Sequence, residues 1–254
     1  MHLNESRGNM YEFVTHTWNP ISGKCYHDCT YCYMKKDGKV LPEIHLIENE
    51  LKGIFQRDYF IFIGSGTDMF AQNVPTEWIL QVLDFCATAT AHQPQGNKTR
   101  FLLQTKNPMR LLEFIGHPLF KSGQIVACTT IETNRHYPGI MNNAPLPNER
   151  ADAMAQLSEQ GIKTYVTVEP LMDFDVEEML SLIKRCNPEQ VNIGANTYRE
   201  VELPEPNSAK PLVDLILCLL SFTKVKIKKN LDGYELKKAL IADIRRKYSY
   251  EKHD

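Results

Sequence analysis

Six runs of strand-forming residues alternate with six runs of helical spacing, and this alternation limits the folds open to the chain. The strand-type runs are rich in Val, Ile, Phe, Tyr and Thr, whereas the helix-type runs repeat apolar residues every three or four positions. Strands separated by helices pair in parallel, so the pattern predicts an α/β fold, closed as a barrel or doubly wound. Strands are expected at 12–18, 59–63, 100–105, 124–130, 163–168 and 190–194, and helices at 43–56, 75–90, 108–115, 147–160, 175–185 and 209–221.

Bulk composition excludes several classes of protein. The chain has 254 residues and is 43% hydrophobic, which is enough for one sizeable core. Its formal net charge of −2 points to no particular partner. No apolar run reaches the roughly 18 residues of a membrane span, and the N-terminal residues lack the apolar core of a secretion signal. We therefore expect a soluble, cytoplasmic protein with no membrane partner.

Charge is distributed unevenly between the C-terminal end and the rest of the chain. Residues 221–254 hold ten Lys or Arg and five Asp or Glu, a net of +5 that leaves −7 elsewhere. An edge strand with protective lysines is expected at 224–229, and a helix at about 233–247. We expect a barrel over 1–222 and a basic extension over 223–254 packed on it. Such an extension favours contact with phosphates; the alternative is an amphipathic helix that closes the side of the barrel.

Three of the seven cysteines are grouped in a loop just after the first predicted strand. Cys25, Cys29 and Cys32 have the spacing C-x3-C-x2-C, which lets one short segment supply three thiolates. Iron–sulfur clusters normally take one cysteine per iron, so three cysteines leave one iron of a [4Fe–4S] cluster open to a small molecule. A structural zinc site is the alternative, but it would need a fourth ligand and usually a second ligand pair, which the sequence does not supply.

Polar residues recur where the predicted strands end. In a barrel of parallel strands the carboxyl ends meet at one face, where active sites lie. A polar residue at one strand end is ordinary, because loops are solvent-exposed and helices need caps. Polar residues at six strand ends in register predict a polar cavity lined from several strands. The residues concerned are Asp68, Gln104, Lys106, Thr130, Glu132, Thr167, Glu169, Asn192 and Asn196.

The cysteine loop, with Tyr31 before its last cysteine, resembles the signature of the radical S-adenosylmethionine (SAM) superfamily. Further segments resemble the group that contains spore photoproduct lyase and its phage-associated relatives. They are Thr17-Trp18-Asn19-Pro20, Cys32-Tyr33, the glycine loop Gly64-Ser65-Gly66-Thr67-Asp68-Met69-Phe70 with Val74-Pro75, Gln104-Thr105-Lys106-Asn107-Pro108 and Val168-Glu169-Pro170-Leu171. The resemblance implies a partial (β/α)6 TIM-type barrel and a cluster that cleaves SAM reductively to a 5′-deoxyadenosyl radical. It also implies an electron donor such as flavodoxin or ferredoxin.

The resemblance implies roles for several of these residues. Cys25, Cys29 and Cys32 would hold the cluster, Lys106 would meet the SAM carboxylate as a point charge, and Glu132 would accept from the ribose hydroxyls. Tyr31 would pack near the adenine or, alternatively, in the core. The expected cofactor-binding residues are Tyr31, Gly64, Ser65, Gly66, Thr67, Asp68, Gln104, Lys106, Glu132 and Asn196.

The substrate is less constrained than the cofactors. Hydrogen abstraction from a nucleic acid or nucleotide is the first expectation, because of the resemblance and the basic extension; a peptide or small metabolite is the alternative. A non-catalytic iron–sulfur electron carrier is the alternative from another class. Cys128 and Glu169 are the candidate catalytic residues, although core filling is the favoured role for Cys128. The cysteine that returns hydrogen in spore photoproduct lyase has no match, so DNA repair is not carried over.

Overall fold

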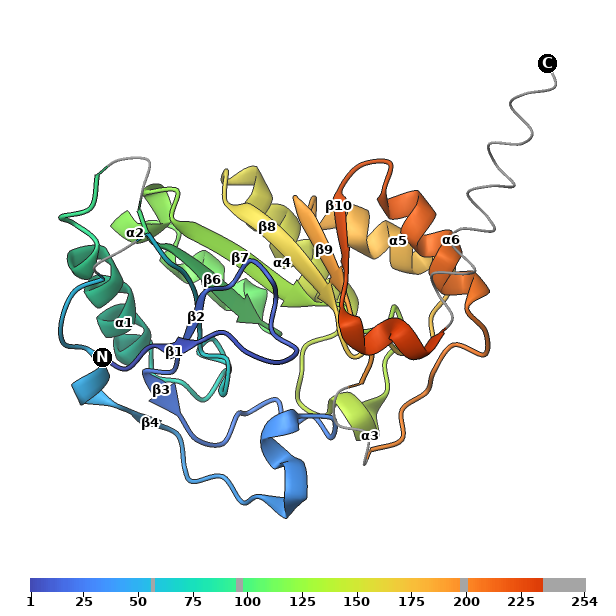
Figure 1. Cartoon of the computed structure of the whole chain (residues 1–254), viewed down its shortest axis with the longest axis horizontal. Coiled ribbons are helices and arrows are strands. Elements are labelled where there is room, and N and C mark those ends of the chain that lie inside the picture. Colours follow the sequence, from blue (N-terminus) through green and yellow to red (C-terminus); the bar gives the residue numbers. More distant parts are fainter. Residues whose placement is uncertain (56–57, 95–97, 197–200, 235–254) are drawn as a thin grey trace.

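A computed structural model describes residues 1–55, 58–94, 98–196 and 201–234 and builds them around one open, curved sheet (Figure 1). Neighbouring strands from β2 to β10 pair in parallel, and β1 pairs antiparallel with β2. The strands in order across it are β1 (Asn4–Glu5), β2 (His16–Trp18), β5 (Phe60–Ile63), β6 (Arg100–Thr105), β7 (Ile125–Thr130), β8 (Lys163–Val168), β9 (Gln190–Ile193) and β10 (Lys224–Ile227). The predicted partial (β/α)6 barrel is confirmed, and β10 extends it by one parallel strand.

Helices pack on one face of the sheet because alternate strand residues point there. The long helices are α1 (Thr76–Ala89), α4 (Pro147–Glu159), α5 (Val176–Arg185) and α6 (Lys210–Leu219). These four match the predicted helices at 75–90, 147–160, 175–185 and 209–221. Shorter elements are α2 (Pro118–Lys121), α3 (Pro138–Met141) and the 3₁₀ segments η1 (Tyr33–Gly38), η2 (Glu48–Glu50), η3 (Pro108–Phe114) and η4 (Lys229–Tyr234). The predicted helix at 108–115 is thus the 3₁₀ segment η3.

The predicted helix over 43–56 is wrong. Its first part is β4 (His45–Leu46), which pairs with β3 (Ile21–Ser22) in a separate two-stranded sheet. Glu50 accepts a hydrogen bond from the Trp18 indole nitrogen at 2.9 Å, and the ring of Phe55 meets that of Trp18 edge-on. Gly53 has φ +108°, which a helix cannot contain. Tertiary contacts with Trp18 therefore override the helical spacing of the segment.

The opposite, inner face of the sheet is covered by the N-terminal loop, residues 6–15. A backbone hydrogen bond of 2.8 Å from Ser6 to Thr15 closes this loop, and Figure 1 shows the dark-blue chain crossing in front of the central strands. Tyr11 and Val14 are buried there in a cluster of inner-face residues: Phe60, Phe62, Leu102, Val126 and Cys128. The inner face is therefore not open along its length, because the chain's own N-terminal loop occupies its middle.

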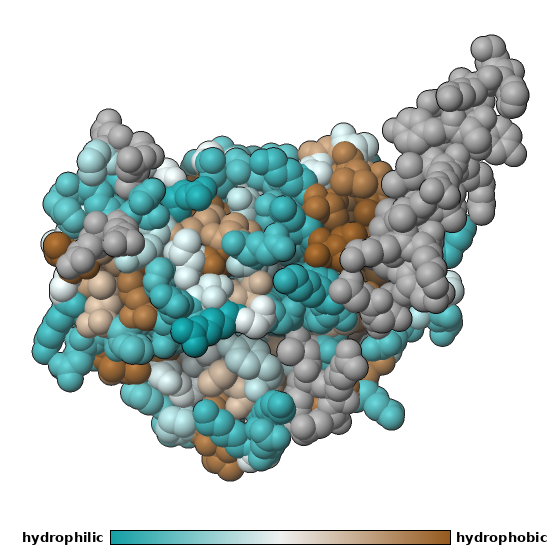
Figure 2. Space-filling view, in the orientation of Figure 1, coloured by the Kyte–Doolittle hydropathy of each residue, from teal (hydrophilic) through white to brown (hydrophobic). Residues whose placement is uncertain are grey.

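Among the described residues the sheet ends at β1 on one side and at β10 on the other. Lys224 and Lys226 of β10 are exposed, as expected for lysines that discourage pairing with another chain. Hydrophobic surface gathers beside it over the connection from α6 to β10 (Figure 2), where Leu220 is 53% and Phe222 40% exposed. The predicted helix at 233–247 lies almost wholly outside the described residues. The boundary between a barrel over 1–222 and an extension over 223–254 stays a prediction, although β10 belongs to the main sheet.

None of the described helices is long and apolar enough to cross a membrane.

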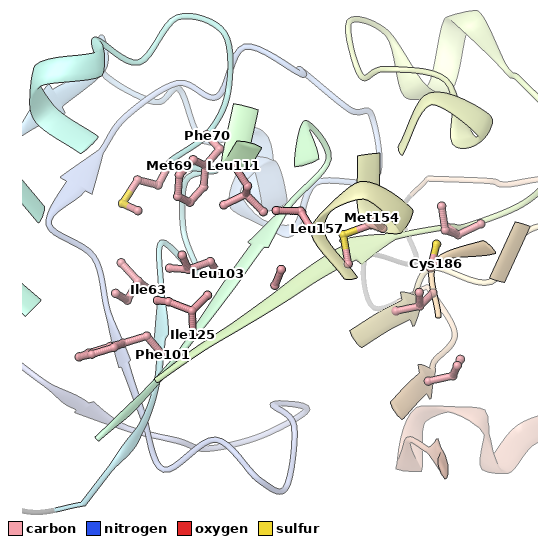
Figure 3. Packing of buried hydrophobic residues seen from close by; sticks show 14 of the residues in the cluster. Ile63, Met69, Phe70, Phe101, Leu103, Leu111, Ile125, Met154, Leu157 and Cys186 are labelled. Atoms are coloured by element: carbon pink, nitrogen blue, oxygen red, sulfur yellow. The ribbon is translucent and has the colours of Figure 1, made fainter. Parts of the chain in front are cut away.

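The principal core lies between the sheet and its helices. Figure 3 shows Leu103 of β6 and Ile125 of β7 among the labelled side chains of this cluster, together with Leu157 of α4. Leu103→Ala should lower the free energy of unfolding by about 2–5 kcal/mol, because it leaves a cavity in a packed core. Leu80→Ala on α1 is the control, since that side chain is 39% exposed. Denaturant unfolding that gave equal losses for both variants would contradict this packing.

Candidate active site

The three cysteines of the predicted cluster site lie in one loop between β3 and η1. Cys25 and Cys32 are half-buried and Cys29 is buried, and all three are free thiols. All three line one cavity of about 420 Å³, which the ends of β5 to β9 also line. The structure therefore brings the cysteine loop and the carboxyl ends of the parallel strands to a shared cavity.

The cysteine loop is held from outside by the segment around α3. The backbone nitrogen of Thr30 donates to the Ile140 oxygen at 3.0 Å. Asn142 donates its side-chain amide to the Asp28 oxygen at 2.7 Å, and Asn143 does the same to the Tyr26 oxygen at 2.9 Å. Sequence reasoning missed these clamping residues, because they lie more than 100 positions from the motif.

The chemistry of the three thiols suits iron–sulfur ligation. A single zinc ion needs its sulfur ligands about 4 Å apart, since each Zn–S bond is about 2.3 Å. A four-iron cluster does not require this convergence, because each cysteine binds a different iron. Three thiols around a shared cavity therefore fit the cluster.

Burial keeps the Cys25 and Cys29 thiols protonated. It raises the pKa of Cys25 to about 12, with the nearby charge of Asp68 acting in the same direction. Burial also raises the pKa of Cys29. Because a metal-bound cysteine is a thiolate, binding at these positions must release protons.

Asp68 ties the cysteine loop to the end of β6. Its Oδ2 accepts hydrogen bonds from His27 Nε2 at 2.8 Å, from Thr105 Oγ1 at 2.9 Å and from the Lys106 backbone nitrogen at 2.9 Å. Burial alone would raise the pKa of Asp68, but the hydrogen bond and charge of His27 outweigh it, so the pKa is lowered. Sequence reasoning selected Asp68 but missed His27, which is buried inside the cysteine loop.

The glycine loop after β5 is shaped by close backbone contacts. Gly64 has φ +77°, and a Cβ there would lie 2.7 Å from the Thr67 oxygen. Asn19 accepts from the Gly66 backbone nitrogen at 2.8 Å, and Thr67 donates its hydroxyl to the Gly23 oxygen at 2.9 Å. All four predicted residues, Gly64, Ser65, Gly66 and Thr67, line the cavity.

Glu132 has partners other than the expected sugar hydroxyls. It is fully buried and does not line the cavity. Its Oε2 accepts from Arg150 Nη1 at 2.7 Å, while its Oε1 accepts from the Tyr31 hydroxyl and lies 3.5 Å from Lys106 Nζ. Burial would raise the pKa of Glu132, but the charges of Arg150 and Lys106 lower it. Sequence reasoning missed Arg150, whose position on α4 gives no sign of this pairing.

Tyr31 and Lys106 meet at this buried carboxylate. Lys106 Nζ lies 5.3 Å from the centre of the Tyr31 ring, which suits a cation–π contact. Burial would lower the pKa of Lys106, but the neighbouring Cys29 and Glu132 outweigh it and raise the pKa. Both Tyr31 and Lys106 line the cavity, so a charged amine is presented there beside an aromatic ring.

The remaining candidates divide between cavity wall and core. Gln104 lines the cavity and accepts from the Tyr11 hydroxyl at 2.9 Å, and Asn196 lines it while donating to the Val201 oxygen at 3.0 Å. Cys128 is fully buried in the inner-face cluster and does not line the cavity. Its proposed catalytic role therefore stays a prediction, and the core-packing alternative agrees with its position.

Glu169 lies in the cavity wall and joins three segments. Its carboxylate accepts from Asn9 at 2.8 Å, from Lys228 at 2.7 Å and from Asn230 at 3.2 Å. A Cβ at Gly194 would lie 2.8 Å from this carboxylate, so the side chain needs a glycine beneath it. Sequence reasoning did not connect Asn9 or Lys228 with Glu169, because neither the N-terminal loop nor the segment after β10 carries a motif for such a contact.

The Glu132–Arg150 pair gives a stability prediction. Glu132→Ala should lower the free energy of unfolding by about 3–5 kcal/mol, because it leaves Arg150 charged and buried. Asp152→Ala is the matched control: the same helix presents Asp152 to Arg185 at 2.5 Å with both side chains more than 40% exposed. The control should cost less than about 1 kcal/mol. Equal losses in denaturant unfolding would count against the buried pair.

Comparisons with known proteins find similarity in structure only. No family model and no curated protein matches the sequence. A spore photoproduct lyase variant with bound AdoMet and dinucleoside spore photoproduct is similar with a TM-score of 0.59 at 11% identity, over 87% of this chain and 78% of that one. Streptococcus suis SuiB bound to S-adenosylmethionine is similar with a TM-score of 0.50 at 13% identity, over 83% of this chain and 49% of that one. The chain thus has the fold of two radical SAM enzymes.

Proposed function

We propose that this chain is a radical SAM enzyme, with a [4Fe–4S] cluster on Cys25, Cys29 and Cys32 and SAM beside it. Three thiols of one loop share a cavity with the ends of parallel strands, and this observation carries the proposal. The likeness of the fold to two SAM-bound proteins supports it. When bound, the cluster supplies the electron that cleaves SAM reductively to the 5′-deoxyadenosyl radical.

The chain's own residues would bind and orient SAM. Lys106 presents its amine to the cavity for the carboxylate of SAM, and the backbone of the glycine loop 64–67 offers polar groups to its ammonium. Asp68 positions the site rather than contacting SAM, because its carboxylate already accepts hydrogen bonds from His27 and from the Lys106 backbone nitrogen. Glu132 holds Tyr31 and Lys106 in place, so we assign it to positioning rather than to the ribose.

The substrate would be a nucleic acid or nucleotide, with a peptide or small metabolite as the second candidate. The similar lyase structure holds a dinucleoside ligand, and the positive charge of residues 221–254 suits phosphates. A small electron-transfer protein such as flavodoxin or ferredoxin would reduce the cluster. The rival is an electron carrier that binds the cluster but has no use for SAM or for polar strand ends.

Anaerobic reconstitution tests the function directly. The reduced protein should bind about four irons per chain and convert SAM to 5′-deoxyadenosine, measured by chromatography with mass detection. Cys25→Ala, Cys29→Ala and Cys32→Ala should each abolish the visible absorbance of the cluster and the product.

Cys86→Ala and Cys218→Ala are the controls, because neither residue lines the cavity. Both should keep the iron, the absorbance and the product. A cluster that persists in Cys29→Ala would refute the ligand set, and a cluster without 5′-deoxyadenosine would favour the electron carrier.

Lys106→Ala tests the SAM site. Binding of SAM to the reconstituted protein should weaken by roughly 1.5–3 kcal/mol in isothermal titration, the scale of a hydrogen bond to a charged group. Lys24→Ala is the control, since Lys24 also lines the cavity but is exposed. The iron content of both variants should equal that of the parent. Unchanged affinity in Lys106→Ala would show that the end of β6 does not contact SAM.

A further inference from the structure

A second cavity lies beside the first, between the N-terminal loop and the β9–β10 edge of the sheet. Its volume is about 620 Å³. Residues 8–13 form one wall, and the other walls come from β9, β10 and the start of η4. The residues that matter for its chemistry are Asn192, Lys226, Lys229 and Glu12.

Asn192 lines this cavity and carries a buried amide donor without a partner. Its side-chain oxygen accepts from Gln190 Nε2 at 2.8 Å, which fixes the orientation of the amide. The other end, Nδ2, is buried and has no hydrogen-bond partner, and the residue is only 1% exposed. A buried amide group without a partner is unfavourable, so a bound group with acceptor oxygens would offset that cost.

Two further lysines, Lys226 and Lys229, line the same cavity. Lys226 pairs in register with Asn192 on the neighbouring strand, so the two side chains stand side by side on one face. Lys229 lines the same cavity and is exposed. The opposing charge is Glu12, whose carboxylate lies 3.9 Å from Lys226 Nζ and is 78% exposed. A weak, exposed pair of this kind leaves Lys226 able to meet an anion.

The two cavities share a wall. Asn9, Met10, Tyr11 and Lys228 line both of them. The Lys228 amine lies 4.6 Å from the centre of the Tyr11 ring and binds Glu169 on the side of the first cavity. A ligand that reaches past this wall can therefore touch both cavities at once.

We infer that the second cavity is an oxyanion subsite, which takes a phosphate or carboxylate group of the substrate. Asn192 Nδ2 and the amine of Lys226 donate to the anionic oxygens, and Lys229 adds charge at the opening. The role in substrate binding rests on the proposed function, because it places the reacting part of the same molecule in the first cavity. Binding of the anion itself does not depend on the cluster.

Paired ligands test the subsite. Uridine and uridine 5′-monophosphate differ only in the phosphate, so titration of the full chain should give a measurable affinity for the nucleotide and a far weaker one for the nucleoside. Inorganic phosphate and succinate, used as competitors, distinguish a phosphate from a carboxylate preference. The affinity should fall as salt is raised, because part of the site is exposed to screening.

Two variants and one matched control locate the binding. Lys226→Gln and the isosteric Asn192→Asp should each weaken nucleotide binding about tenfold, the effect of losing one charge-assisted hydrogen bond. Lys224→Gln should leave it unchanged, because Lys224 is on the same strand but does not line the cavity. Thermal melting checks the fold of Asn192→Asp, and if that variant unfolds, the comparison of Lys226 with Lys224 decides.

Equal affinity for uridine and its monophosphate would overturn the subsite, as would equal loss from Lys224→Gln and Lys226→Gln. The outcome is separable from that of the proposed function. Selective anion binding without 5′-deoxyadenosine would keep the site and reject the radical chemistry. Formation of 5′-deoxyadenosine with no selective anion binding would keep the radical chemistry and reject the subsite.

Discussion

The cavity depends on a buried carboxylate that is kept charged. Glu132 follows β7 and has no contact with solvent, yet Arg150 at 2.7 Å and the nearby Lys106 keep its pKa lowered. A buried ion pair is costly to assemble, and here it organises three elements at once. The start of α4, the end of β6 and the cysteine loop, through Tyr31, all converge on this one side chain.

Asp68 plays a matching part on the other side of the cysteine loop. It follows β5 and binds His27 of the loop and the backbone after β6. The loop is therefore anchored by two buried carboxylates from different strand ends, one through an imidazole and one through a phenol. Lys106 takes part in both contacts, its backbone toward Asp68 and its amine toward Glu132. Three thiols can keep a fixed arrangement in this way without a disulfide or a regular element to hold them.

The sequence predicts the strands well and the long-range polar contacts poorly. Strands such as β7 and β8 are rich in β-branched residues and largely buried on both faces, which is a local signal. The segment 43–56 has helical spacing, but its side chains are used against Trp18, and no local pattern reveals that. Glu132 was identified as a site residue from its place after a strand. Its partner Arg150 could not be identified in this way. The sequence of the helix does not distinguish an exposed arginine from one that is paired in the core.

The inner face also depends on contacts that the local sequence does not reveal. The strand predicted over 12–18 begins only at His16, and the loop before it buries Tyr11 in the inner-face cluster. This loop divides the barrel interior into two cavities of different character, one with cysteines and carboxylates, the other with lysines and an unpartnered amide donor. Glu169 fixes the division, because it binds the loop through Asn9 and the sheet edge through Lys228. A residue selected for its position at a strand end therefore sets the boundary between the two cavities, whatever chemistry takes place in the first.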